Sequence, residues 1–331
     1  MRSTLLAYVL ALAALLALTA LAFTVGRYPV PIGQLIDLLI GKSQALPPTA
    51  RTVLFEIRGP RVLSALLVGA ALAAAGTAYQ GMFRNPLVSP DILGVSTGAA
   101  LGAVGAIFLS LGVFATQLFA FGGGLAAVAL VYWIGSRMRG HEPMLALVLT
   151  GVVIGTLLGS AIALLKYLAD PYNQLPAITF WLLGSLAAIA PQDLAVAAPL
   201  ALAGLAPMLL LRWRVNLLSL PDDEARALGV DTRRLRSVVV AAATLMTAAA
   251  VAVSGIIGWV GLLIPHAARL VVGPHFGRLL PLSMLIGAAF LLAVDTLCRT
   301  IAPIEVPPGV LTALIGTPFF LWLFALSRRG W

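Results

Sequence analysis

Charged side chains are scarce in this sequence. Only 10% of its 331 residues are Asp, Glu, Lys or Arg, whereas 61% are hydrophobic. A soluble domain carries roughly a quarter charged residues, so this composition excludes an ordinary water-soluble protein. Apolar runs of about 20 residues recur along the chain, and each is long enough to cross a bilayer. The sequence therefore predicts an all-α polytopic membrane protein with a single transmembrane domain over residues 1–331.

Cysteine and histidine are almost absent, which excludes several kinds of site. Cys298 is the single cysteine, so no disulfide can form within the chain, and we interpret it as a small apolar core residue. The segment 141–143 (His-Glu-Pro) lacks the second histidine of a zinc motif, because position 145 is leucine. His266 and His275 have no cysteine or carboxylate cluster around them in the sequence. We expect no metal site and no cofactor.

Motifs for energy conversion are also missing. The triplet Gly-Lys-Ser at 41–43 is not a P-loop, because the glycine required five residues earlier is replaced by Ile36. Asp91, Asp193 and Asp295 are expected near the ends of apolar segments, so no carboxylate is expected in the middle of a span, where an ion relay would place one. The chain is therefore not expected to be an enzyme, and its energy must come from elsewhere.

The apolar runs predict ten crossings. These are residues 4–25, 61–82, 92–111, 113–135, 144–168, 193–211, 237–256, 258–272, 280–298 and 308–326. The apolar stretch 176–188 is too short to cross and is expected to lie along the surface or to enter the membrane partway. A cleavable signal peptide is the alternative for the first run, but the run exceeds the usual 7 to 15 apolar residues, which favours a retained helix.

The basic residues favour ten crossings over nine. With ten crossings and a cytoplasmic start, 14 of the 21 Lys and Arg residues lie inside, whereas nine crossings divide them 11 to 10. Because positive residues collect on the cytoplasmic side, both termini are predicted to be cytoplasmic. The basic residues that give the net charge of +9 lie mostly at the ends of apolar runs. This distribution fits membrane topology and not nucleic-acid binding.

Glycines spaced four apart predict close helix contacts. Two such series occur, one at Gly94, Gly98 and Gly102 and the other at Gly151, Gly155 and Gly159. Small residues at this spacing let helix backbones approach closely in lipid.

The segment 222–236 is the most charged part of the chain, with eight charged residues in fifteen. Ser219 or Asp222 is predicted to cap a short helix with an acidic first turn. Gly229 is predicted to end it, and Asp231 to cap a second short helix. The topology places this segment in the cytoplasm. A solvated loop and a docking surface both remain open on these features alone.

Four ordered motifs carry a resemblance to a known family. They are NPLVSPDILGVSTGAALGA (85–103), ALGVD (227–231), GLLIPH (261–266) and VPPGVLTALIGTPFFLWL (306–323). Over nearly its full length the chain resembles the membrane permeases of binding-protein-dependent ABC importers (type II importers) for iron chelates, haem and cobalamin. The resemblance implies a ten-helix subunit with short cytoplasmic coupling helices. It also implies a second permease copy, a cytoplasmic ATP-binding subunit dimer and a periplasmic or lipid-anchored substrate-binding protein.

The resemblance assigns roles to individual positions. In the family, the loop at about 218–236 forms coupling helices that sit on the ATPase, and outward-facing arginines accept glutamates of the binding protein. The coupling positions are Leu218, Ser219, Asp222, Asp223, Glu224, Arg226, Ala227, Leu228, Gly229, Val230 and Asp231. The docking positions are Arg58, Arg61 and Arg299. The cytoplasmic gate matches Met144 and Leu145, where relatives can carry small polar residues, so the gate of this chain is expected to be apolar.

The predicted function is the permease subunit of an ATP-driven importer of a metal chelate, a ferric siderophore or haem, in the bacterial inner membrane. Cobalamin and a molybdate-type oxyanion are alternative cargoes within the same fold. An ion-coupled secondary transporter is an alternative from another class, and a membrane receptor without transport is a third.

Overall fold

A computed structural model describes residues 2–26, 28–40, 47–138 and 143–327 of the chain. The described residues are helical and contain no strand. In chain order the elements are α1 (Arg2–Thr24), α2 (Ile32–Leu39), α3 (Pro48–Thr52), the π-helix η2 (Val53–Arg58), α4 (Gly59–Phe83), the 3₁₀ turn η3 (Pro90–Leu93), α5 (Val95–Phe108), α6 (Val113–Gly135), α7 (Pro143–Leu168), α8 (Gln174–Leu183), α9 (Pro191–Leu210), α10 (Arg212–Leu217), α11 (Asp222–Ala227), α12 (Thr232–Ser254), α13 (Val260–Val272), α14 (Phe276–Thr300) and α15 (Pro308–Ser327). The triplet at 41–43 and residues 141 and 142 lie outside the described residues.

Each of the ten predicted spans contains a helix. Seven apolar helical segments of the described chain are long enough to cross a membrane, and they include α1, α4, α6, α7, α9, α12 and α14. The apolar helices α5, α13 and α15 are shorter by the same criterion. The predicted surface stretch at 176–188 holds most of α8 and the turn after it. The chain is therefore a multi-pass all-helical membrane protein, in which helices satisfy the backbone polar groups that lipid cannot.

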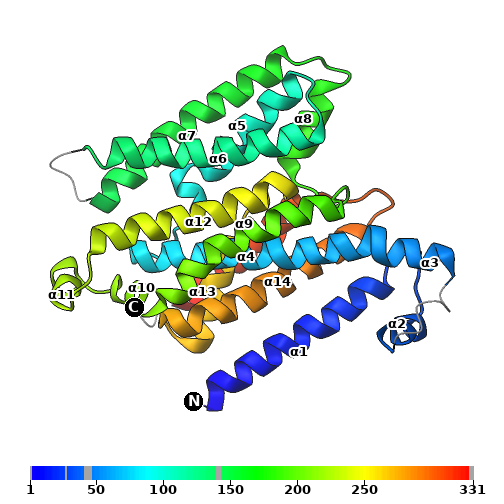
Figure 1. The fold of residues 1–331 in the computed structure, drawn as a ribbon, viewed down its shortest axis with the longest axis horizontal. Helices are drawn as coiled ribbons and strands as arrows, with labels where there is room; N and C mark the ends of the chain where they lie inside the picture. Colours follow the sequence, from blue (N-terminus) through cyan, green and yellow to red (C-terminus); the bar gives the residue numbers. More distant parts are fainter. Residues whose placement is uncertain (1, 27, 41–46, 139–142, 328–331) are drawn as a thin grey trace.

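The helices form two packed groups (Figure 1). In one group α5 packs on α6 and α7, with α8 against α5. In the other, α4, α12 and α14 form the buried centre, α9 packs on α12, and α1 runs along α14. Helix α12 joins the groups, because it contacts α4 and α9 on one side and α5 and α6 on the other.

Glycine pairs bring the central helices into backbone contact. A Cβ added at Gly69 of α4 would lie 2.3 Å from the Gly287 carbonyl oxygen of α14. One added at Gly76 would lie 1.9 Å from the Gly261 carbonyl oxygen of α13. No larger side chain fits at these positions unless the helices move apart, as expected for small-residue packing in lipid.

The two predicted glycine series are confirmed only in part. Gly98 and Gly102 pack against α6, and Gly151 packs against Ile92, as predicted. A Cβ at Gly155 or Gly159 would meet no described atom within 4 Å, so these two do not mediate a helix contact within the chain. Gly94 is also different, because it ends η3 in the left-handed conformation with φ of +77°.

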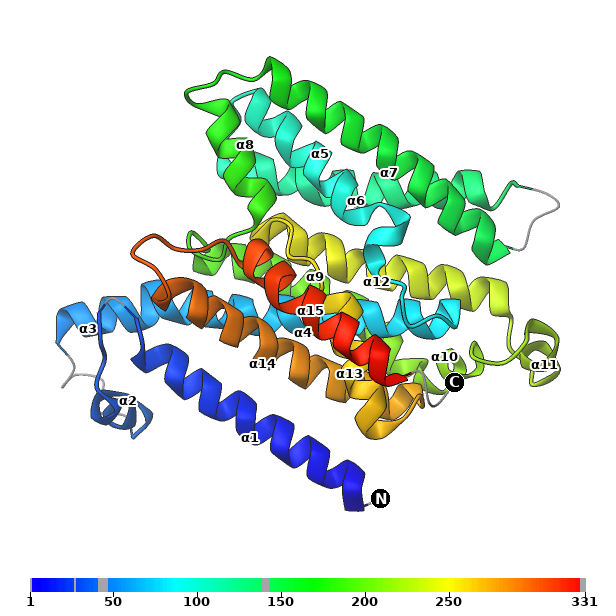
Figure 2. The same cartoon turned by 180° about the vertical axis from the view of Figure 1, so that it is seen from behind.

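Different helices lie at the two ends of the bundle. Helix α11, the start of α1 and the end of α15 lie toward one end, which we call the α11 end (Figure 2). Helices α2 and α3 lie toward the opposite end, which we call the α3 end. The described chain thus begins and ends toward the same end of the bundle.

Candidate coupling and docking sites

Helix α11 begins as the sequence predicts but with a different cap. Asp222, Asp223 and Glu224 occupy its first turn, where carboxylates favour the positive end of the helix dipole. The capping residue is Pro221, and no side chain caps the helix. The predicted caps are therefore wrong: Ser219 Oγ donates to the Asn216 carbonyl oxygen at 2.7 Å, and the Asp222 carboxylate binds arginines.

Helix α11 ends at the predicted glycine, but the helix after it is longer than predicted. Gly229 has φ of +80°, a left-handed conformation that favours glycine and stops the helix. Asp231 caps the next helix, with its Oδ1 accepting from the Arg234 backbone N–H at 3.0 Å. That helix is not short, however. It is the 23-residue α12 itself, one of the buried central helices.

Asp222 anchors α11 to the bundle. Arg236 of α12 donates to both of its oxygens, at 2.7 and 2.5 Å. Arg84, which follows α4, donates to Asp222 Oδ1 at 3.1 Å and to the Leu218 carbonyl oxygen at 3.1 Å. The hydrogen bond from Arg236 holds the pKa of the Asp222 carboxyl below its ordinary value, the nearby arginine charges act in the same direction, and partial burial opposes them. The anchor thus joins α11, α12 and the end of α4 in one ionic cluster.

The other predicted coupling residues divide into a buried and an exposed set. Leu218 and Val230 are buried and hold the segment to the bundle. Ser219, Asp223, Glu224, Arg226, Ala227, Leu228, Gly229 and Asp231 are exposed. Leu228 is a hydrophobic side chain with 56% of its surface exposed among charged neighbours. Leu228 follows directly after α11, beside the exposed charged residues of the segment.

A buried ionic cluster occupies the α3 end. Asp295 of α14 is completely buried, and Arg61 of α4 contacts both of its oxygens at 2.9 to 3.1 Å. Arg299 lies one helical turn beyond Asp295, and its Nε is 3.2 Å from Asp295 Oδ2. Arg61 also pairs with Glu305 in the loop after α14, at 3.0 Å.

The three predicted docking arginines are buried at the α3 end. Arg58, Arg61 and Arg299 have only 4%, 6% and 8% of their surface exposed. Arg58 donates to the carbonyl oxygens of Phe23, at the end of α1, and of Tyr28, after the bend that follows it. Arg299 Nη2 donates to the Ala22 carbonyl oxygen of α1 at 3.3 Å. Internal carboxylates and the backbone at the end of α1 bind these guanidinium groups.

The predicted gate residues lie at the start of α7. Leu145 is 48% exposed, whereas Met144 is partly buried and packs against the main core. The pair is apolar, as expected from its composition.

The position of the polar residue Asp91 was not predicted from the sequence. After α4 the chain turns back into the bundle, so that Pro90 and the carbonyl of Leu72, at the middle of α4, both approach Gly261. Asp91 thus lies at mid-depth and not near an end of the bundle. Its carboxylate accepts from Ser96 Oγ and lines a cavity of about 240 Å³ together with Thr247 and Trp259. The Ser-Pro-Asp sequence before a helix was the available signal, but hydropathy predicted Asp91 near the end of an apolar segment and not inside the bundle.

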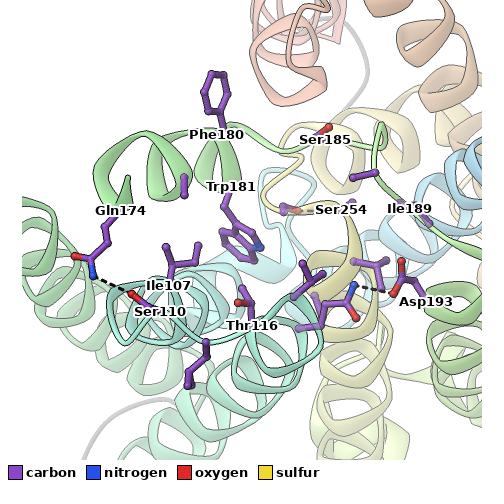
Figure 3. A pocket seen from close by; sticks show the side chains of 18 of the residues that line it. Ile107, Ser110, Thr116, Gln174, Phe180, Trp181, Ser185, Ile189, Asp193 and Ser254 are labelled. Atoms are coloured by element: carbon purple, nitrogen blue, oxygen red, sulfur yellow. Dashed lines mark hydrogen bonds between the residues drawn. The ribbon is translucent and has the colours of Figure 1, made fainter. Parts of the chain in front are cut away.

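A larger pocket of about 490 Å³ lies between α5, α6, α8, α9 and the end of α12 (Figure 3). Phe180 and Trp181 of α8 line it, and Asp193 closes one side through a 3.0 Å hydrogen bond from Gln117. The predicted docking arginines are not among its lining residues.

The sequence matches a known transport family over most of its length. Residues 14–325 match the model of the FecCD transport family. The chain belongs to the FecCD transport family. The match covers nearly all of the described helices.

Curated FecCD-like relatives are permeases with different named cargoes. The molybdate import system permease protein MolB of Haemophilus influenzae is 41% identical over 323 residues, covering 96% of this chain and 94% of MolB. The cobalamin import system permease protein BtuC of Halobacterium salinarum is 44% identical, covering 84% of this chain and 74% of BtuC. The hemin transport system permease protein HmuU of Yersinia pestis is 42% identical, covering 83% of each chain.

A solved structure agrees with this family assignment. A structure titled as an inward-facing conformation of a putative metal-chelate type ABC transporter superposes with a TM-score of 0.88 at 38% identity, covering 96% of this chain and 97% of the other. The FecCD chain described here is therefore an ABC-importer permease subunit.

Proposed function

We propose that this FecCD permease forms the membrane channel of an ATP-driven, binding-protein-dependent importer with ten crossings. The full-length family match carries this proposal. The positions of α11, the start of α1 and the end of α15 at one end support an even number of crossings, with both termini and α11 in the cytoplasm. The chain is one membrane domain over residues 1–331, and two copies pair around the pathway in the inner membrane.

The exposed part of 218–231 is the proposed contact with the ATP-binding subunits. Three features support this: the anchored Asp222, the left-handed Gly229 and the exposed Leu228. Because only residues 228–231 separate α11 from α12, a push on α11 is expected to reach the centre of the bundle. The apolar pair Met144 and Leu145 at the start of α7 is the proposed cytoplasmic gate.

The arginine cluster at the α3 end is the proposed docking region for the substrate-binding protein. Arg58, Arg61 and Arg299 give this end of the bundle three guanidinium groups, and guanidinium pairs with carboxylate in a bidentate geometry. Docking through a buried arginine requires that the arginine exchange one of its internal partners.

A metal chelate, a ferric siderophore or haem, is the proposed cargo. The hemin permease of Yersinia pestis and a probable iron chelatin permease of Helicobacter pylori, which is 44% identical, support it. Molybdate is the second candidate, because the relative named for molybdate matches 96% of this chain. Cobalamin is a third, supported by the cobalamin permease of Halobacterium salinarum.

Ion-coupled transport is the alternative mechanism. The absence of a mid-membrane carboxylate no longer argues against it, since Asp91 lies beside the middle of α4. Family membership argues against it instead, because the curated relatives are ABC permeases or import-system permeases.

Uptake into vesicles that contain the permease and its ATPase tests the proposal. Radiolabelled haem, a ferric siderophore, cobalamin and molybdate are each supplied with the substrate-binding protein, with ATP or a sodium or proton gradient as the energy source. We expect uptake of an iron complex only with both ATP and the binding protein. Uptake driven by a gradient alone would contradict the mechanism, and ATP-driven uptake of molybdate alone would contradict the cargo.

A further inference from the structure

Arg61 has two carboxylate partners in very different surroundings. The Asp295 side chain has none of its surface exposed and lies within α14. The Glu305 side chain is 34% exposed and lies in the loop between α14 and α15. Since a buried charge without a partner is strongly destabilising, Asp295 cannot leave the arginine at low cost. A partly exposed carboxylate on a loop can leave, because water solvates it when it does.

We propose that Glu305 occupies on Arg61 the place that a carboxylate of the substrate-binding protein takes on docking. The inference rests on the proposed function, since it assumes a binding protein that docks at the α3 end. Asp295 keeps the guanidinium oriented during the exchange, through contacts to its Nε and Nη2. The Nη1 group, which pairs with Glu305 at 3.0 Å, is then free for an incoming carboxylate.

The other two predicted docking arginines have a different role. Arg58 binds two backbone carbonyl oxygens, and Arg299 binds the buried Asp295 and the carbonyl of Ala22. These partners belong to the end of α1, the bend after it and the interior of α14, so replacing them would release α1 from the bundle. We therefore assign Arg58 and Arg299 to anchoring α1 and assign the exchange to Arg61 alone.

Charge explains why the exchange needs a carboxylate. The cluster holds three arginines (Arg58, Arg61 and Arg299) and two carboxylates (Asp295 and Glu305), a formal charge of +1. Withdrawal of Glu305 leaves three arginines and one carboxylate, a formal charge of +2. A partner carboxylate at Arg61 restores the original balance, whereas a neutral or basic partner surface does not. The partner surface that fits is therefore acidic.

Affinity for the binding protein tests the exchange. The permease–ATPase complex is placed in lipid nanodiscs, and the Kd for the cognate substrate-binding protein is measured by biolayer interferometry for wild type and Glu305→Gln. The matched control is Glu56→Gln. Glu56 is an exposed carboxylate of η2 near the same end and has no ion pair among the described residues, so its removal changes the surface charge equally.

Glu305→Gln is expected to bind about tenfold more tightly, because the apparent Kd falls as the open form of Arg61 becomes more populated. Glu56→Gln is expected to change the Kd less than about twofold, as a charge with no competing role. Reaction with phenylglyoxal, followed by mass spectrometry, gives a second readout that needs no partner. Labelling of Arg61 is expected to rise in Glu305→Gln and to stay unchanged in Glu56→Gln.

Equal affinity and equal labelling in the two variants would overturn the proposal. So would a loss of folding in Glu305→Gln, because the proposal treats the Glu305 contact as dispensable to the fold. Failure of the proposed function looks different: the wild-type complex itself would then bind no substrate-binding protein.

Discussion

Replacing Asp222 with asparagine should loosen α11 from the bundle without removing any apolar contact. The wild-type carboxylate accepts two hydrogen bonds from Arg236 at 2.7 and 2.5 Å and one from Arg84 at 3.1 Å. Hydrogen bonds to charged groups contribute about 1.5–3 kcal/mol each when buried. The Asp222 side chain is 31% exposed, and asparagine keeps one acceptor oxygen, so screening and the residual bond reduce the loss. We expect a local destabilisation of about 1–2 kcal/mol.

Hydrogen–deuterium exchange on the purified permease measures this directly. A loss of 1–2 kcal/mol corresponds to about 5- to 30-fold faster exchange through local opening of α11 and the first turn of α12. Asp223→Asn is the control for this stability measurement, because Asp223 lies in the same helical turn, is exposed and has no ion pair with any described residue. Equal exchange in the two variants would refute the anchoring role of Asp222.

Two further predictions follow from the same structure. Because the folded-state pKa of Asp222 is lowered, its stabilising contribution is complete above the unfolded pKa of about 3.9 and is lost as pH falls through the lower folded value. Exchange protection of α11 should thus be constant from neutral pH to about 5 and fall in stronger acid, a pH dependence that Asp222→Asn removes. Gly76→Ala should destabilise the bundle by about 1–3 kcal/mol, because its Cβ would lie 1.9 Å from the Gly261 carbonyl oxygen. Gly105→Ala, in open space on α5, should leave the melting temperature in detergent unchanged or slightly raised; equal losses in the two variants would contradict the packing argument.

Hydropathy predicted the helices well, because lipid selects long apolar segments regardless of how they later pack. All ten predicted ranges contain helices, and the boundaries of α6 coincide with the prediction. Helix α2 and the α3–η2 segment went unpredicted. Both are short and flanked by prolines, so they lack the length on which span prediction depends.

The sites were harder to predict where contacts join distant parts of the chain. The left-handed Gly229 and the cap at Asp231 depend on neighbouring residues and were predicted correctly. The burial of Arg61 depends on Asp295, which is 234 residues away in sequence. Asp295 and Arg299 lie four residues apart on one helix, a spacing that favours an ion pair. This spacing was the one local signal that the arginines at the α3 end pair with carboxylates of the same chain.

The role of Asp91 illustrates a second limit. A sequence shows that the chain leaves an apolar helix at Phe83, but it does not show whether the next residues stay at the surface or return into the bundle. Here they return, because Gly76, Gly151 and Gly261 leave room for the backbone between helices. Such a re-entrant path is decided by three-dimensional packing and leaves only a weak local pattern.

The exposed Leu228 tests most directly whether ATP hydrolysis acts on this permease through α11. Leu228 has 56% of its surface exposed, so Leu228→Ser removes an apolar contact surface while leaving the fold intact. Leu210→Ser at the end of α9 is the control, since Leu210 is 82% exposed outside the coupling segment. The deciding measurement is the rate of ATP-driven uptake in vesicles that contain the permease and its ATPase. We expect uptake to fall by about tenfold or more for Leu228→Ser, as for a contact hot spot, and to stay at the wild-type rate for Leu210→Ser. Full uptake by Leu228→Ser would contradict the coupling role of α11.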